Sequence, residues 1–221
     1  GEFMKKLKRL FSVLLTFALV MSFSVSVFAA EKAPDSALTV NEYKEFLAQE
    51  SPEDLQKFEA LSADEQEKFI DYLLDPATYS GDLVAPGITR ATTYDRTEKV
   101  ASGADLGAAR STRYDAWGTS TVDILGIEIL EYRIEVGYSV SGSTITTIYY
   151  NDAFVVKNLN PLVQTDTTSK SAYISGNVVH AKGTFYYKLG PIEGLSVQIG
   201  NIYGELLAYS DGDTSISYWR D

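Results

Sequence analysis

The sequence predicts a mainly β protein, either an antiparallel β-sandwich or an open barrel, preceded by a short acidic α-helical segment. Helix-capping residues and apolar residues at helical spacing fill the stretch up to Pro76, whereas apolar and polar residues alternate from Thr92 onward. The charge also changes along the chain, because residues 31–80 contain 13 acidic and 4 basic side chains and residues 81–221 contain 16 and 11. Two compositions of this kind indicate two structural units.

The first 30 residues predict export. Residues 4–30 have the three parts of a signal peptide: a basic start, an apolar run, and small residues at Val27 and Ala30 that suit a signal peptidase. A retained membrane anchor is the alternative, because about 20 apolar residues span a bilayer. Hydroxyl side chains within the run favour cleavage near Ala30. Residues 1–3 precede the methionine and resemble residues left by cloning. We therefore expect a secreted, extracellular protein, and the form of the signal is typical of bacteria.

Residues 31–76 predict two to three short helices. Thr39 and Ser62 each stand three residues before a glutamate, the capping-box pattern that satisfies the first free N–H groups of a helix. Ser51, followed by a proline and two acidic residues, is a third helix start. Apolar residues at helical spacing follow each start, and Pro76 ends the last helix. Short amphipathic helices cannot bury their apolar sides alone, so we expect them to pack on one another or on the β domain.

Residues 77–91 predict a linker, since this stretch contains Gly81, Pro86 and Gly87. Two interpretations of the helical segment that precedes it stay open. The segment is either an integral N-terminal subdomain or a prosegment that is removed by cleavage at a basic residue at the end of the linker. The integral subdomain is the favoured interpretation, because linkers of this composition are common in proteins that are not cleaved there.

Residues 92–221 predict an antiparallel β domain. In residues 132–138 the apolar side chains hold one parity and the charged side chains hold the other, and residues 179–189 form a second alternating stripe. Turn-forming residues, among them Ser175-Gly176-Asn177, separate the strand candidates from one another. The further candidates are residues 120–125, 145–150, 153–159, 171–175, 195–209 and 215–219.

Charge and cysteine content exclude several functions. Subtracting the four basic and one acidic residues of the first 30 leaves 15 basic and 29 acidic side chains, a formal net charge of −14. No nucleic-acid partner is expected, since phosphate binding needs a basic surface. The sequence contains no cysteine, which excludes disulfides, thiol catalysis and zinc or haem held by cysteine.

Catalytic and metal-binding patterns are weak, so we expect no catalytic residues, no metal and no cofactor, and an enzyme is the less favoured interpretation. His180 is the single histidine, and strand parity places it on a polar face beside Lys182. No nucleophile elbow and no phosphate-binding glycine motif occurs. Carboxylate pairs could support glycoside hydrolysis, and Asp211-Gly212-Asp213 could bind calcium. A solvated sheet face and an Asp-Gly turn explain the same residues.

Aromatic residues form the candidate binding site of the β domain. Twelve of the 15 tyrosines and both tryptophans follow Thr92. Tyr149-Tyr150 and Tyr186-Tyr187 are adjacent pairs in predicted strands, and neighbouring strand residues point to opposite faces, so one ring of each pair should leave the core. Exposed rings on a rigid sheet bind sugars or partner chains, although tyrosine also favours strands in general. The predicted ligand-binding residues are Trp117, Tyr149, Tyr150, Tyr186, Tyr187 and Trp219.

Two functional hypotheses follow. The first is a secreted, non-catalytic interaction protein whose aromatic-rich sheet binds a glycan or a protein outside the cell, and it requires the rings to cluster on one exposed face. The second is a secreted antibacterial, bacteriocin-like or membrane-active protein with an acidic helical prosegment, and only this hypothesis implies membrane contact. In layout the chain resembles small exported proteins of Gram-positive bacteria, and that resemblance implies no activity.

Overall fold

The computed structural model describes residues 38–80, 85–100, 111–190 and 198–221. The predicted signal peptide, residues 4–30, and the three residues before it lie outside the described residues. The described residues all belong to one compact unit. Within the described residues, no helix has the length and apolar character needed to cross a bilayer.

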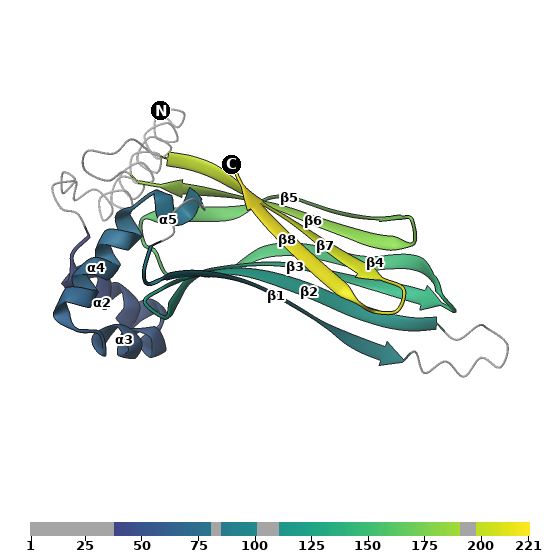
Figure 1. Cartoon of the computed structure of the whole chain (residues 1–221), viewed down its shortest axis with the longest axis horizontal. Coiled ribbons are helices and arrows are strands. Elements are labelled where there is room, and N and C mark those ends of the chain that lie inside the picture. Colours follow the sequence, from purple (N-terminus) through teal and green to yellow (C-terminus); the bar gives the residue numbers. More distant parts are fainter. Residues whose placement is uncertain (1–37, 81–84, 101–110, 191–197) are drawn as a thin grey trace, which may run out of the picture. The chain divides into compact units, whose positions relative to one another are not determined.

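Helices precede the strands, as predicted (Figure 1). Their bounds are α2 (Val40–Glu50), α3 (Pro52–Glu59), α4 (Ala63–Leu74) and the single turn α5 (Ala77–Ser80). The capping boxes predicted at Thr39 and Ser62 are confirmed: the Glu42 and Glu65 N–H groups donate to the two hydroxyls, and each glutamate carboxylate accepts from the capping residue's own N–H. At Ser51 the cap differs, because its hydroxyl donates to the Asp54 carboxylate at 2.7 Å.

Helices α2, α3 and α4 share a small aromatic core. The rings of Tyr43, Phe58 and Phe69 are fully buried, with centroid distances of 5.1 to 5.4 Å between them. These residues come from α2, α3 and α4, so each helix contributes one ring. The helices therefore bury their apolar sides against one another, as short amphipathic helices must.

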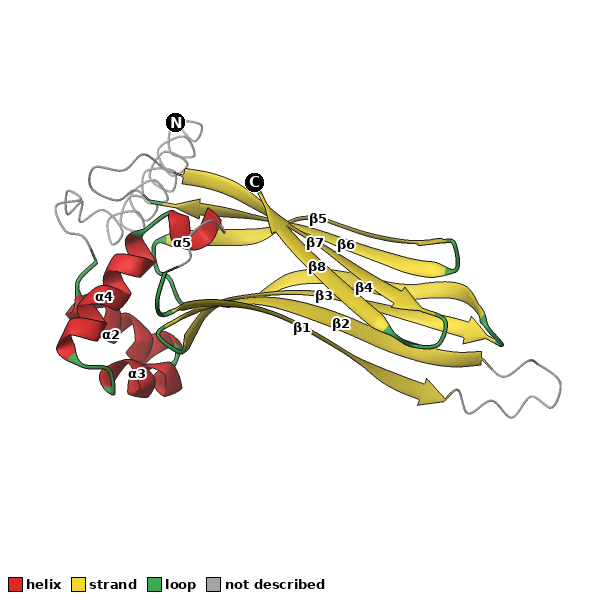
Figure 2. Ribbon diagram, in the orientation of Figure 1, coloured by secondary structure: helices red, strands yellow, loops and turns green. Residues whose placement is uncertain are grey.

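The strands form two four-stranded antiparallel sheets, which confirms the predicted fold class as a β-sandwich behind a helical segment (Figure 2). Sheet A has the order β1-β2-β3-β4 and sheet B the order β5-β6-β7-β8, so every hydrogen-bonded pair joins strands adjacent in the sequence. At the two seams between the sheets, β4 lies beside β5 and β1 beside β8. The strand bounds are β1 (Ile88–Val100), β2 (Ser111–Ile124), β3 (Ile127–Ser141), β4 (Thr144–Asn158), β5 (Val163–Ser175), β6 (Val178–Leu189), β7 (Gln198–Tyr209) and β8 (Thr214–Arg220).

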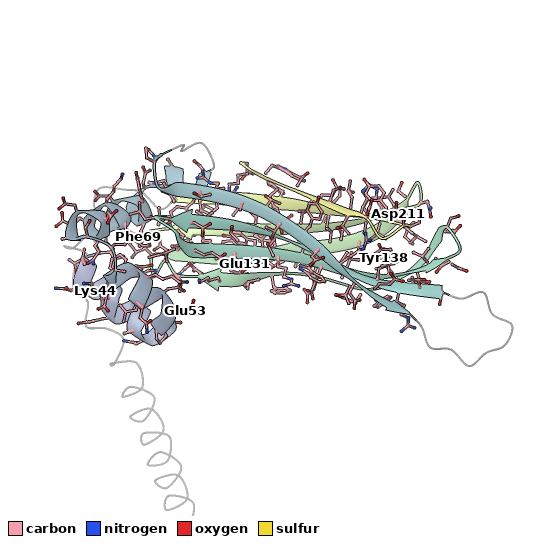
Figure 3. The ribbon with its side chains drawn as sticks, turned by 60° about the horizontal axis from the view of Figure 1, so that its bottom comes forward. Lys44, Glu53, Phe69, Glu131, Tyr138 and Asp211 are labelled. Carbon is pink, nitrogen blue, oxygen red and sulfur yellow. The ribbon has the colours of Figure 1, made fainter. Side chains whose placement is uncertain are left out.

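Close packing joins the inner faces of the sheets. Ile134 of β3 is 1 % exposed. A Cβ added to Gly204 of β7 would lie 2.5 Å from the Cδ1 atom of Ile134. The Tyr132 and Phe185 rings meet across the sandwich with centroids 4.9 Å apart. Toward the end of the sheets away from the helices, where Figure 3 labels Tyr138 and Asp211, the Tyr138 hydroxyl donates to the carbonyl of Tyr209 at 2.9 Å. The sheets are thus held by apolar packing with a few tyrosine hydrogen bonds.

Several boundaries differ from the sequence expectation. Residues 145–150 and 153–159 were expected as separate strands but belong to the single strand β4 apart from Leu159, which lies beyond its end. The expected linker, residues 77–91, contains α5 and the start of β1 at Ile88. Burial of Tyr79, which is 1 % exposed, and a hydrogen bond of 2.9 Å from its hydroxyl to the carbonyl of Leu73 hold this turn, so tertiary contacts rather than periodicity define it.

Polar contacts attach the helices to the sheets. The Tyr43 hydroxyl donates to the carbonyl of Leu159 at 3.0 Å, and the buried Asn160 amide donates to the carbonyl of Leu73 at 2.9 Å. Lys157 of β4 pairs with Asp54 of α3 at 2.8 Å, although Asp54 is only 3 % exposed. Removal of the helical segment, as the prosegment interpretation requires, would therefore expose buried polar groups of β4 and the loop after it.

Candidate binding face

The six predicted ligand-binding residues lie in three different places. Trp117, Tyr149 and Tyr150 lie on the outer face of sheet A. Tyr186 and Trp219 lie on the outer face of sheet B, where the Trp219 ring stacks on that of Tyr203 with centroids 5.8 Å apart. The expectation of one common cluster is therefore not met by the full set.

Tyr187 requires a correction. Its side chain is 1 % exposed and lies in the core, 6.2 Å from the Tyr79 ring between centroids. The physical reason is the strand parity already seen in the sequence, since Val179, Ala181 and Phe185 share its side of β6 and are also buried. Tyr187 thus belongs to the core and not to an exposed surface.

Sheet A forms a regular outer surface over three neighbouring strands. Strand register places Asp115, Gly137 and Tyr150 in one row across β2, β3 and β4. The next row is Trp117, Glu135 and Asp152, and the third is Thr119, Arg133 and Phe154. Aromatic rings from β2 and β4 therefore share this surface with charged side chains from all three strands.

A β-bulge adds a fourth ring to this surface. The register shifts between Gly137 and Tyr138, so that Gly137 pairs with Tyr150 while Tyr138 pairs with Ile148, and Tyr149 is the extra residue. Both tyrosine rings consequently lie over Gly137, where an added Cβ would be 2.3 Å from each. The strand-parity rule predicted that one of these rings would leave the core, but both do, because a bulge breaks the alternation. We call Trp117, Tyr149, Tyr150 and Phe154 the aromatic face.

The sequence reasoning missed Phe154. It is 36 % exposed and lies opposite Arg133. The sequence nevertheless contains a pattern that identifies Phe154. Tyr150, Asp152 and Phe154 are alternate residues of β4 and so point to the same side, and the charged residue between the two rings indicates that this side faces outward. The expected strand break between residues 150 and 153 concealed this continuity.

Charged groups hold the rings of the aromatic face. The Arg133 guanidinium lies over the Trp117 ring at 5.1 Å, and that of Arg113 over the Tyr149 ring at 5.5 Å, both within the range of cation–π attraction. The Tyr149 hydroxyl donates to the Asp115 carboxylate and to the carbonyl of Tyr114 at 3.0 Å. The rings are thus oriented before any partner arrives.

Tyrosine hydroxyls on this face stay protonated at neutral pH. Burial, followed by the charges of Asp115 and Glu135, raises the pKa of Tyr150 to about 12. Burial and the hydrogen bond to Asp115 also raise the pKa of Tyr149. Both phenols therefore remain hydrogen-bond donors over the physiological pH range.

The other candidate residues are engaged in local contacts. The Nδ1 atom of His180 lies 3.0 Å from a Glu205 carboxylate oxygen, and its ring stacks on Tyr173 with centroids 4.9 Å apart. The Asp213 carboxylate pairs with Arg96 at 3.0 Å. Throughout the part of the chain that the structure describes, no three His, Asp or Glu side chains gather closely enough to hold a metal ion.

Comparison with known protein families, with curated proteins and with solved structures finds no match for this chain. The geometry of the aromatic face is therefore the basis for a functional proposal.

Proposed function

We propose that this chain is a secreted, non-catalytic binding protein whose aromatic face on sheet A binds a glycan outside the cell. The observation that supports the proposal is the exposure of neighbouring rings on a rigid sheet: Tyr149 and Tyr150 are 42 % and 37 % exposed, and Phe154 shares their strand. Burying rings of this size supplies much of the binding energy at recognition surfaces.

The mixture of rings and charged groups suits a sugar chain. The apolar side of a pyranose ring packs flat on an aromatic ring, and its hydroxyls then hydrogen-bond to neighbouring polar side chains. On this surface Glu135 and Asp152 supply acceptors and Arg133 supplies donors, all within the rows that also carry the rings. Because the rings are already oriented, binding requires little additional ordering of side chains.

Binding of a glycan is tested with the double variant Trp117→Ala/Tyr150→Ala. A matched control, Tyr203→Ala/Trp219→Ala, removes two rings from the outer face of sheet B. The probes are insoluble bacterial cell wall and soluble oligosaccharides, assayed by pull-down and by titration calorimetry. We expect the sheet A variant to lose about tenfold or more in affinity and the control to bind like the wild type, because a binding ring contributes more than about 1 kcal/mol.

Two results would contradict this proposal. One is binding of glycans that is unchanged in the sheet A variant, and the other is binding of no glycan by the wild-type protein. In the second case, co-purification from culture medium of a protein that the sheet A variant no longer retains would assign the face to a protein partner.

Secretion and processing are tested together by the intact mass of the product in the culture medium. We expect a product that begins at Glu31, since the described helices contribute buried groups such as Tyr43 and Asp54 to the compact unit. A product that begins near Thr92 would instead make the helical segment a prosegment. It would also favour the antibacterial hypothesis, which a zone-of-inhibition assay checks.

A further inference from the structure

Arg220 directs a positive charge into the sandwich. It is the last residue of β8 and lies directly opposite Ile202 of β7. Residues directly opposite each other in an antiparallel pair point to the same face, and Ile202 is 2 % exposed. The Arg220 side chain therefore extends toward the core, on the same side of β8 as Tyr218, whose hydroxyl donates to the carbonyl of Gly118 in sheet A at 3.1 Å.

One edge of this guanidinium is left without an acceptor. The Nε and Nη2 atoms of Arg220 are both buried and have no hydrogen-bond partner among the residues that the structure describes. These two nitrogens lie on the same side of the planar group, and their N–H bonds are parallel. Through that edge a guanidinium donates two parallel hydrogen bonds to two oxygens of a carboxylate or phosphate.

A second guanidinium lies nearby. Arg90 of β1 is opposite Val122, which is 1 % exposed, so it also extends toward the inner face. Its Nη2 atom donates to the carbonyl of Thr78 at 2.6 Å, which fixes it beside α5. Burial and the Arg90 charge lower the pKa of Arg220, while Tyr132 and Tyr187 act in the opposite direction. Arginine nevertheless stays charged in proteins, so two cations share this region.

A buried charge such as that of the Arg220 guanidinium is normally paired with an anion, because an unpaired charge in the interior is strongly disfavoured. We propose that the free edge of Arg220, with Arg90 beside it, binds a small oxyanion, the carboxylate or phosphate group of a ligand, at the inner face of the sandwich next to α5. This site is separate from the aromatic face, which lies on the outer side of sheet A, and it does not depend on the glycan proposal.

Oxyanion binding is tested on the full chain. Sodium phosphate and sodium acetate are separate probes, and sodium chloride at matched ionic strength is the reference. We expect a saturable rise in melting temperature with phosphate or with acetate, and the anion that gives it identifies the ligand group. Arg220→Gln should weaken that binding by about tenfold or more, since it removes two charge-assisted hydrogen bonds. The control Arg96→Gln removes an exposed arginine of β1 and should bind like the wild type.

Arg220→Gln should fold, because it removes a buried charge that has no acceptor in the described residues. A second measurement uses the wild-type protein alone: the Nε–H signal of Arg220 in a nitrogen-15 NMR spectrum should shift on titration with the active anion. The proposal is overturned if neither anion gives a saturable effect beyond chloride. It is also overturned if Arg220→Gln retains the wild-type response.

Discussion

Both sheets of the sandwich have an inward-facing strand glycine, Gly118 in sheet A and Gly204 in sheet B, but Gly137 of sheet A faces outward. In sheet B, Gly204 faces the other sheet, and its missing side chain admits Ile134 and Tyr218. In sheet A, Gly137 faces outward, and its missing side chain admits the Tyr149 and Tyr150 rings. A glycine on the inner face thus lets two sheets approach each other, whereas a glycine on the outer face lets rings lie flat on a sheet.

Gly204→Val gives the largest expected effect in this comparison. Its Cβ would lie 2.5 Å from Ile134 Cδ1 and 2.6 Å from Tyr218 Cε1, so the core must move to admit it. We expect a loss of about 3 kcal/mol in the free energy of unfolding, measured by urea denaturation. The control Gly137→Ala should cost less than about 1 kcal/mol, because the exposed tyrosine rings can turn toward solvent.

Gly137→Ala also tests the binding role of the rings that lie over Gly137. It should weaken glycan binding while the fold is kept, since it displaces two rings of the aromatic face. A large loss of stability in Gly137→Ala, or none in Gly204→Val, would show that the two glycines do not have these different roles.

Asp54→Asn tests a second difference, between the end of sheet A that contacts α3 and the seam where β4 meets β5. In the Asp54–Lys157 pair the carboxylate of α3 is buried and the lysine is half-buried, whereas both side chains of the Asp152–Lys170 pair are exposed. Burial alone would raise the pKa of Asp54, but hydrogen bonds from Lys157, Ser51 and Lys57 outweigh it and lower the pKa from 3.8 to about 2. We therefore expect Asp54→Asn to cost about 2 kcal/mol at neutral pH.

The contribution of Asp54 to the free energy of unfolding depends on pH. Because the folded pKa of Asp54 is below its unfolded value, its contribution is present at neutral pH and is lost as the pH falls from about 4 toward 2. Wild type and Asp54→Asn should thus converge in stability toward pH 2, as measured by urea denaturation across that range. The control Asp152→Asn should lower stability by less than about 1 kcal/mol, since exposed ion pairs contribute little. Equal effects of the two substitutions would contradict the proposed difference.

Local signals in the sequence predicted the local structure well. The capping boxes at Thr39 and Ser62 and the alternation in β3 and β6 depend on residues only a few positions apart, and the structure confirms them. The turn at Gly176 and Asn177 was likewise marked by its residue types, and both residues have positive φ angles of 58° and 62°.

Features that depend on distant residues could not be predicted in this way. Strand parity places Tyr150 and Trp219 on outward sides, but only the pairing of strands decides that they lie on different sheets. The outward turn of Tyr149 depends on a register shift against β3. The approach of Arg220 to Arg90 joins opposite ends of the β domain across the seam between β8 and β1.

The strand order also has a consequence for how the protein folds. Since every hydrogen-bonded strand pair joins sequence neighbours, each sheet can grow hairpin by hairpin through the turns that follow β2, β3, β5 and β7. Loops of this kind are closed at low entropic cost, so strand pairing itself is a sequence of short-range steps. The contact of Ile134 with Gly204, by contrast, joins residues far apart in the sequence, so the long-range part of folding is the closure of one sheet on the other.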